Sequence, residues 1–448
     1  MSDNGWRETT VGVLCDEGVL HTQTGPFGSQ LHSYDYVPNG VPVVPTEGIG
    51  RRRLLTKGIP EVAEETATRL SRHRLKAGDI LFARRGVQAT GLSAIVMPRQ
   101  AGWLCGTGAI LLRIKGSAVD PDFLSFFLSA EESVLWLKQH AVGAVMPNLN
   151  EGIIRQIPLT LPPFPEQKII AAVLGSLDDK IELNRRMNAT LEAMARALFQ
   201  SWFVDFDPVR AKLDGRQPAA LDPATAELFP DSFQDSEIGH IPKGWQISKL
   251  RDLTEHLSRG ISPVYIEHGG VCVLNQKCIR DHRVDFSKAR RHDAAKKPVK
   301  DRSLQLHDVL VNSTGMGTLG RVAQLFSLPE PATADSHVTI VRANSDTDSL
   351  FLGVNLTNRE DEIEELGEGS TGQTELSRTR LGELKVITPP RPLQQAFGEA
   401  VNSLFLRISE NELQSRTLAT LRDTLLPKLL SGELRVTSLE QTLEEALA

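Results

Sequence analysis

The feature that most constrains the fold of this chain is an internal repeat that spans nearly all of its 448 residues. Over most of its length the second half follows the first at an offset of 227 to 229 residues, so that Gly86 corresponds to Gly315 and Arg113 to Arg342. A repeat of this kind predicts two similar structural units in one chain. Other matches are Gly5-Trp6 with Gly244-Trp245, Gly91 with Gly320, Pro162-Pro163 with Pro389-Pro390, and Gln167 with Gln394.

Each half is predicted to begin with a mixed region of short strands and helices. The runs DILFARRG (79–86), GAILLRIK (108–115), DVLVNSTG (308–315) and HVTIVRA (337–343) are apolar, largely β-branched, and bounded by Gly or polar residues, which predicts strands. A shorter helix is expected to start at Asp120-Pro121.

Each half is then predicted to end in one long helix. Apolar residues alternate spacings of four and three, which is the 3.5-residue period of a coiled-coil seam. Pro165 and Pro392 suit a first helical turn, and Gly432 suits a helix end. The seam positions are Ile170, Leu174, Leu177, Ile181, Asn184, Asn188, Leu191, Ala195 and Leu198, and then Phe397, Val401, Leu404, Ile408, Asn411, Ser415, Leu418, Arg422 and Leu425.

Helices this long and this one-sided need a partner, and we expect them to pair antiparallel with pseudo-twofold symmetry. Asn184 and Asn411 lie near the middle of their helices, so antiparallel pairing would bring them together, where a buried polar pair can fix the register. The alternative is that both asparagines face solvent.

Composition places the chain among ordinary globular proteins. It has 40% apolar and 24% charged residues, no apolar run long enough to span a bilayer, and no basic-then-apolar start typical of a signal peptide, so we expect a cytoplasmic location. The four cysteines are expected to be reduced thiols, because their spacing fits neither a disulfide framework nor a metal site. They are Cys15, Cys105, Cys272 and Cys278.

Charge is unevenly distributed although the net charge is only −6. Residues 51–85 hold ten Lys or Arg against four acids, and residues 277–302, at nearly the repeat offset, again hold ten against four. Two basic segments at corresponding places favour contact with a nucleic acid at two points. A solvated charged face is the alternative for either segment alone.

Motifs for catalysis are missing from the sequence. GMGTLG at 315–320 matches the dinucleotide fingerprint GxGxxG, but a strand-like run follows it where a Rossmann site needs a helix. We therefore interpret it as a glycine-containing loop between strands. The chain also lacks a P-loop, HExxH, GxSxG and the NPPY-type tetrapeptide of amino-methyltransferases, which predicts a binding protein without chemistry of its own.

The chain resembles the specificity subunit of type I restriction-modification systems over essentially its whole length. The stretch PPFPEQKIIAAVLGSLDDKIELNRRMNATLEAMARALFQSWFVDFDPVRAK at 162–212 is similar to that family's central helix and its exit. From residue 389 the chain reads PPRPLQQAFGEAVNSLFLRISENEL and ends its helix in LLPKLLSGEL, similar to the family's second helix. One departure is Leu393, where the first copy has the family-like Glu166.

The resemblance implies an α+β fold with two mixed α/β target-recognition domains joined by two long antiparallel coiled-coil helices in a pseudo-twofold circular arrangement. It implies a non-catalytic subunit that binds double-stranded DNA at a bipartite target, with the helices setting the unread spacer. Two DNA-methyltransferase subunits would dock on the helices, and restriction/translocase subunits would join through them. No cofactor is expected in this chain, since S-adenosylmethionine, ATP and Mg would belong to those partners.

The expected boundaries follow from the repeat and the resemblance. They are a first target-recognition domain at 1–161, a first spacer helix at 162–206, a linker at 207–242, a second target-recognition domain at 243–388, a second spacer helix at 389–432 and a tail at 433–448.

Candidate contacts lie in the polar loops after two predicted strands and just before each long helix. Arg, Lys, Asn and Gln are favoured there because they bind phosphates and base edges. The predicted DNA-binding residues are Arg84, Arg85, Gln88, Asn148 and Asn150 in the first half, and Lys277, Arg280, Asn312, Thr314, Gln373 and Arg378 in the second.

Aromatic residues cluster at the end of the first long helix. They are predicted either to bind the methyltransferase partner or to cap the helix pair; they are Phe199, Trp202, Phe203 and Phe206. Two other functions stay open on the residues alone: a coiled-coil scaffold or adaptor that binds only proteins, and a nucleotide-dependent enzyme built around GMGTLG.

Overall fold

The computed structural model of the chain describes residues 5–56, 58–86, 88–143, 147–369 and 374–435. It divides into two compact units. The first unit comprises Met1–Glu182 with Ser415–Ala448, and the second comprises Leu183–Gln414. Each unit thus contains one mixed α/β domain together with about one half of each long helix.

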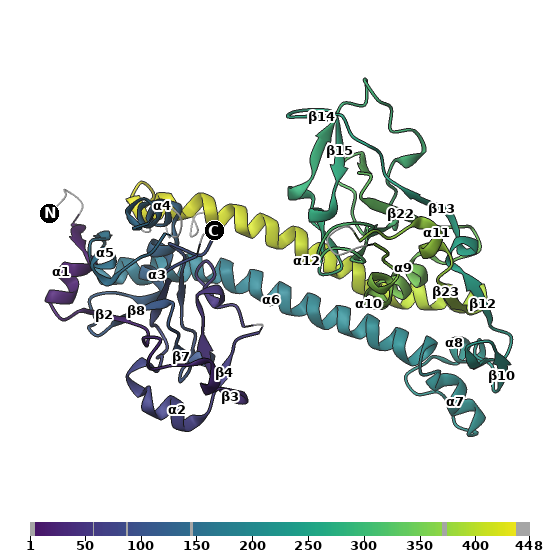
Figure 1. The fold of residues 1–448 in the computed structure, drawn as a ribbon, viewed down its shortest axis with the longest axis horizontal. Coiled ribbons are helices and arrows are strands. Elements are labelled where there is room, and N and C mark those ends of the chain that lie inside the picture. The colour runs from purple at the N-terminus through teal and green to yellow at the C-terminus, as the bar shows by residue number, and fades with distance from the viewer. Residues whose placement is uncertain (1–4, 57, 87, 144–146, 370–373, 436–448) are drawn as a thin grey trace, which may run out of the picture. The chain divides into compact units, whose positions relative to one another are not determined.

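The first unit is built on a four-stranded antiparallel sheet with strand order β2-β8-β5-β6 (Figure 1). Its central strands are fully or mostly buried, which confirms the strands predicted at 79–86 and 108–115. A three-stranded sheet, β4-β3-β7, and the antiparallel pair β1-β9 complete its strands. The bounds are β1 Arg7–Thr10, β2 Leu20–Thr24, β3 Tyr36–Val44, β4 Glu61–Val62, β5 Ile80–Ala83, β6 Ser93–Ile95, β7 Leu104–Cys105, β8 Ala109–Ile114 and β9 Pro158–Leu161.

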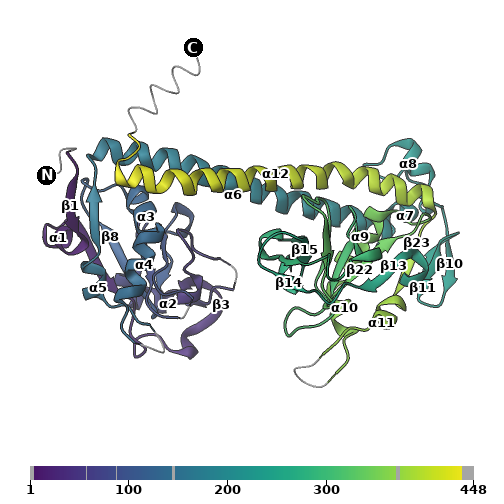
Figure 2. The ribbon, with the colours of Figure 1, turned by 90° about the horizontal axis from the view of Figure 1, so that it is seen from above.

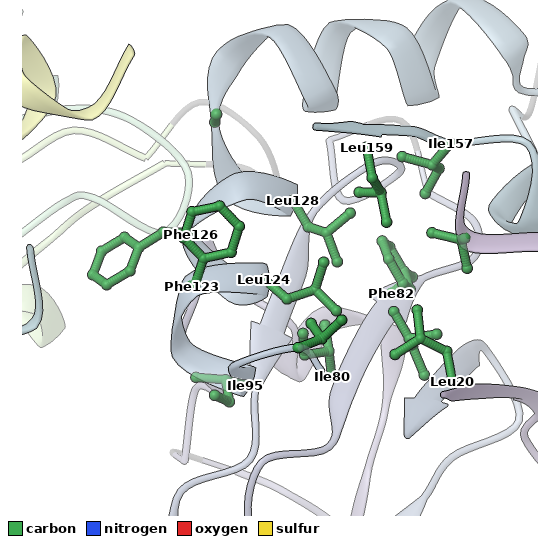
Figure 3. Close-up of a cluster of buried hydrophobic side chains, with 14 of the residues drawn as sticks. Leu20, Ile80, Phe82, Ile95, Phe123, Leu124, Phe126, Leu128, Ile157 and Leu159 are labelled. Atoms are coloured by element: carbon green, nitrogen blue, oxygen red, sulfur yellow. The ribbon is translucent and has the colours of Figure 1, made fainter. Parts of the chain in front are cut away.

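Helices cover one face of that sheet. Asp120 caps α3 by accepting a hydrogen bond from Phe123 N–H (2.9 Å), as its position before Pro121 predicts. Figure 3 shows how Leu124 and Leu128 of α3 face Phe82 of β5 within one buried cluster. The helices are α1 Val11–Asp16, α2 Glu64–Arg69, α3 Pro121–Ser129, α4 Glu131–His140 and α5 Glu151–Arg155.

The second unit repeats the four-stranded main sheet and the terminal strand pair of the first, but its second sheet has four strands instead of three. Its main sheet has the order β13-β22-β19-β20, a second sheet has the order β14-β18-β15-β21, and β12 pairs with β23. In both units the second sheet contains one parallel pair, β3-β7 and β15-β21. The bounds are β12 Gln246–Lys249, β13 Thr254–Arg259, β14 Tyr265–Ile266, β15 Val271–Leu274, β16 Ile279–Arg280, β17 Arg283–Val284, β18 Arg290–His292, β19 Val309–Asn312, β20 Val322–Gln324, β21 Ala332–Ala334, β22 Val338–Ala343 and β23 Lys385–Thr388.

Helix α9 (Ser349–Thr357) lies between this sheet and α12 (Figure 2), since Leu350, Phe351 and Val354 pack in one cluster with Phe397 and Val401 of α12. Two shorter helices complete the domain, α10 Glu360–Glu365 and α11 Arg378–Gly382.

The repeat preserves a buried ion pair at the heart of each domain. Arg113 donates two hydrogen bonds to Asp79, at 2.8 and 2.6 Å, and Arg342 donates two to Asp308, both at 2.7 Å. Both carboxylates are almost fully buried, so each needs its arginine. The match of Arg113 with Arg342 seen in the sequence is therefore a shared structural contact.

The long helices are α6 (Phe164–Phe203) and α12 (Arg391–Ser431). In the first unit the start of α6 packs on the end of α12, with Ile170 and Leu174 in one cluster with Leu426 and Leu430. In the second unit the end of α6 packs on the start of α12, so the segments run antiparallel within each unit. None of the predicted seam positions is exposed, which confirms the 3.5-residue pattern.

Residues 207–242 correct the expectation of a linker without regular structure. They form α7 (Asp207–Leu213), α8 (Pro223–Glu227) and a hairpin of β10 (Phe233–Ser236) and β11 (Gly239–Pro242). Val209, Phe229 and Ile241 are buried in the aromatic core of the second unit, so this segment is part of that unit. The helices and strands of this segment are too short for a periodic pattern to be recognised in the sequence.

GMGTLG forms a loop between β19 and β20, which pair directly as antiparallel neighbours. Gly315, Gly317 and Gly320 have φ angles of +105°, +66° and +79°, where other residues are strained. The interpretation as a glycine-containing loop is confirmed. Across the described ranges, no helix is long and apolar enough to cross a membrane.

Candidate nucleic-acid interface

In the first unit, two segments far apart in the sequence form one polar surface at the end of β5. Leu149 N–H donates to Arg84 O (2.7 Å), and Arg84 Nε donates to Asn148 Oδ1 (3.1 Å). Arg85 and Asn148 form a backbone bridge. Arg85, Gln88 and Asn148 are exposed, so the structure brings these predicted contacts together at the surface.

The loop after β5 is held in place by the buried Thr90, and the nearby exposed Asn150 caps a helix. Thr90 is buried, and its hydroxyl donates to Gly86 O (2.7 Å) and reaches Pro147 O (3.2 Å). Asn150 caps α5 by accepting from Ile153 N–H (2.9 Å). The structure thus gives Asn150 a structural function, and DNA contact by it stays a prediction.

The second unit repeats this arrangement at the end of β19. Leu376 N–H donates to Ser313 O (2.8 Å), and Thr314 and Glu375 form a backbone bridge. Ser377 then caps α11 by accepting from Arg380 N–H (3.2 Å), as Asn150 caps α5. In both units the strand exit and the segment before the long helix therefore meet, as the predicted residues require.

Thr314 belongs to a hydrogen-bond network that the sequence did not single out. Gln276 Nε2 donates to Thr314 O (2.7 Å), and Thr314 Oγ1 lies 2.8 Å from His337 Nδ1. His337 N–H donates to the buried Asp335 (2.9 Å), whose pKa is raised by burial against the opposing effect of that hydrogen bond. The sequence offered two signals for this network: Gln276 stands next to Lys277, and His337 begins a predicted strand.

Asn312 needs a correction. Its side chain is fully buried, and its Nδ2 donates to Gln276 O (3.2 Å). It is therefore not a surface contact in this structure but a support for the segment that carries Lys277. Both faces of β19 are buried along all four of its residues, so its last residue is buried although it is polar.

The other candidates of the second unit lie at the surface. Lys277 and Arg280 are exposed, and Arg280 is 3.9 Å from Asp281. Arg378 is exposed at the start of α11. Gln373 lies outside the described residues.

The basic segment 51–85 is mostly not a free phosphate-binding face. Several of its arginines pair with carboxylates of the same unit, such as Arg69 with Asp35 (3.0 Å) and Arg53 with Asp179 (3.4 Å). Arg52 is buried between Asp178 and Asp122. Most of the arginines named here therefore form ion pairs within the unit and do not make up the expected phosphate-binding surface. Lys57 lies outside the described residues.

Asn184 and Asn411 are both buried and in contact, as antiparallel pairing predicts. Asn184 Nδ2 donates to Gln414 Oε1 (2.8 Å) and to Asn411 O (3.3 Å). Asn411 Nδ2 in turn donates to Asn188 Oδ1 (2.8 Å). The alternative in which both asparagines face solvent is thereby contradicted, and their control of the register stays a prediction.

The aromatic side chains at the end of α6 are interior, which contradicts the first predicted alternative, a surface for the methyltransferase partner, and agrees with the second, packing at the end of the helix pair. Phe203 lies 5.1 Å from Phe397 and 5.8 Å from Trp245 between ring centroids. Such edge-on and tilted pairs stabilise a core beyond the burial of their area. The four residues are 3 to 7% exposed: Phe199, Trp202, Phe203 and Phe206.

The fold and this surface define a class of protein with two repeated units. In each unit a polar surface, formed where a central strand ends, lies beside the paired long helices, as expected of a binding protein. Residues 33–193 match the model of a family described as "Type I restriction modification DNA specificity domain". This match and the relatives below confirm the resemblance, seen in the sequence, to the specificity subunits of type I restriction-modification systems.

Two curated relatives carry that name in full. The chain is 25% identical over 411 residues to the type I restriction enzyme HindI specificity subunit of Haemophilus influenzae, covering 80% of this chain and 87% of the relative. It is 27% identical over 339 residues to the MjaIX specificity subunit of Methanocaldococcus jannaschii, covering 73% and 72%. A crystal structure of the S subunit from M. genitalium has a similar fold, with a TM-score of 0.57, 15% identity, and coverage of 96% and 97%.

Proposed function

We propose that this chain reads a bipartite DNA target, with one recognition domain for each half-site. The observation that carries the proposal is the repetition of the same polar surface, formed by a strand exit and the segment before a long helix, in both units. Exposed Arg85 and Gln88 in one unit and Lys277 and Arg280 in the other supply phosphate and base-edge contacts. The loops differ in sequence because the half-sites differ.

The paired helices are proposed to act as a ruler that fixes the unread spacer between the half-sites. Their antiparallel seam and its asparagine contacts support a fixed register and a pseudo-twofold arrangement. Because a helix rises 1.5 Å per residue, the length of the pair would set the separation of the two domains.

Two DNA-methyltransferase subunits are proposed to dock on the outer faces of the helices, with restriction/translocase subunits joining through them. Apolar side chains on those faces are exposed, including Met194 at 52% and Leu413 at 61%. Adenine methylation with S-adenosylmethionine and cleavage with ATP and Mg would belong to those subunits. This chain would determine the DNA sequence at which those reactions take place.

The proposal is tested by selecting duplexes from a randomised pool with the chain and its methyltransferase subunits. The expected result is two fixed half-sites separated by a constant spacer, and a protein-only scaffold would enrich no sequence at any salt concentration. Arg85→Ala should weaken specific binding and lower the slope of log affinity against log salt by about one. Arg216→Ala, an exposed arginine on the segment after α7, is the control and should leave both unchanged.

A further inference from the structure

One arginine ties the second recognition domain to both long helices. Arg283, on β17, donates from Nη1 to Glu412 Oε1 of α12 (2.7 Å), and its Nη2 pairs with Glu192 of α6. A guanidinium can do this because its rigid fork presents several donors in one plane. A lysine has a single ammonium and does not match two carboxylates in the same way.

The interface that Arg283 bridges, between the second domain and the long helices, is incompletely packed. A cavity of about 90 Å³ lies beside it, lined by residues of the domain such as Val284 and Phe286 and of the helices such as Ala195 and Ile408. Phe326 stacks on Phe405 of α12 at 4.2 Å on the same cavity wall. Because protein side chains do not fill this pocket, the Arg283 contact carries more of the placement of the domain here than it would at a close-packed interface.

A two-residue hairpin turn presents Arg283. Asp281 and His282 connect β16 and β17, and their positive φ angles of +50° and +60° are those of the tight turn that joins two antiparallel strands. His282 is also held by Glu360, 3.4 Å from its Nδ1. The turn and this contact fix the position of Arg283 between the two glutamates.

We infer that Arg283 is a positioning residue that sets the tilt of the second recognition domain on the helices and thereby the spacer length that the subunit accepts. This inference rests on the proposed function. Both carboxylates that Arg283 contacts belong to the long helices, and neither belongs to the surface that is proposed to read a half-site. Arg283 therefore controls the distance between the half-sites and not their sequence.

The test compares Arg283→Ala with a matched control in the full chain with its methyltransferase subunits. Arg291→Ala is that control, because Arg291 is equally exposed (36%) and also binds a carboxylate, Glu330, but within the domain. Binding is measured on duplexes with the selected half-sites fixed and the spacer varied by one or two base pairs. Thermal unfolding of each variant checks that the second unit is folded.

The expected result is that Arg283→Ala lowers the preference for the correct spacer by about fivefold, corresponding to about 1 kcal/mol for a half-exposed ion pair. Half-site preference stays as in the parent, and Arg291→Ala changes neither property. Arg283→Lys should relax the spacer partly, since it keeps the charge and loses the fork.

An Arg283→Ala variant that is folded and as strict about spacer as the parent overturns the inference while leaving the proposed function intact. If that variant does not fold, Glu412→Gln decides instead: a strict spacer in it overturns the inference, and a relaxed one supports it. A parent chain that enriches no half-sites defeats the proposed function itself, so the two failures are distinguishable.

Discussion

The two units fasten their recognition domains to the helices with arginines in contrasting surroundings. In the first unit Arg52 is 9% exposed and lies between Asp178 (2.7 Å) and Asp122 (2.8 Å), with its guanidinium 3.6 Å from the Phe126 ring centroid. Asp178 also accepts from Arg422 of α12 (2.7 Å). In the second unit Arg283 is 36% exposed and borders a cavity.

The contrast predicts that one fold, repeated in one chain, holds its first domain on the helices more firmly than its second. Burial lowers the pKa of Arg52 against the opposing attraction of Asp178 and Asp122, so the two carboxylates offset part of the cost of burying its charge. A buried pair is little screened by salt, whereas a half-exposed pair weakens as salt is added. We therefore expect the second domain to be the one whose placement responds to conditions.

The largest effect is expected from Arg52→Met, which keeps the contact with Phe126 and removes the charge. It should destabilise the first unit by about 1.5 to 3 kcal/mol, because the buried Asp178 loses one of its two arginine partners, whereas Asp122 is 55% exposed and its carboxylate can be hydrated. Hydrogen exchange of the first unit measures the loss. Arg53→Met, whose partner Asp179 is 74% exposed, should cost no more than about 1 kcal/mol. Equal losses of stability in the two variants would contradict the distinction between the buried Arg52 and the more exposed ion pair of Arg53.

A smaller effect should follow from a difference between the tryptophans of the two units. Trp6 Nε1 donates to Glu166 Oε2 (3.1 Å), whereas Trp245 Nε1 is buried without a hydrogen-bond partner among the described residues, in a unit where Leu393 replaces the glutamate. Glu166→Leu should destabilise the first unit by about 0.5 to 1.5 kcal/mol, the net value of one hydrogen bond.

Glu166→Gln is the control for that change, since its amide oxygen can still accept from Trp6. It should recover at least half of the loss in a denaturant titration. A Gln variant as unstable as the Leu variant would show that the hydrogen bond is not the reason for the difference.

The smallest effect concerns pH and the pair that supports Arg283. Glu360 raises the pKa of His282. Burial would raise the pKa of Glu360, but the contact with His282 (3.4 Å) and the hydrogen bond from Val322 N–H outweigh burial and lower it. The stabilisation from His282 is complete below pH 6.5 and is lost as pH rises through the higher folded pKa. That from Glu360 is complete above pH 4.5 and is lost as pH falls.

The pair should therefore contribute most between about pH 4.5 and 6.5, by no more than about 1 kcal/mol because both side chains are about one-third exposed. The difference in melting temperature between the parent and Glu360→Gln, followed from pH 4 to 8, measures this window. A difference that stays constant with pH would contradict the assignment.

Much of the fold was predictable because the sequence repeats itself and its helices have a strict period. The seam positions, the central strands and the loop at GMGTLG follow from spacing alone, and the meeting of Asn184 with Asn411 follows from pairing two such helices antiparallel. These features depend on local patterns that every copy must keep.

The rest depends on long-range packing that no local pattern records. Arg52 and Arg69 look like phosphate-binding residues until the fold brings Asp178 and Asp35 to them. Phe203 resembles a surface anchor until Trp245 covers it. For the candidate site, the sequence identified the strand exits and the segments before the long helices, but not that Asn312 faces inward.

The central claim, that the helix pair measures the spacer, is tested most directly by lengthening both helices together. Seven residues inserted between Glu182 and Leu183 and seven between Gln414 and Ser415 preserve the seam period at the boundary of the two units. They extend the pair by about 10 Å, which corresponds to at most about three base pairs. Duplex selection should return the same half-sites with a longer spacer. An unchanged spacer, or new half-sites with the old spacer, would contradict the account.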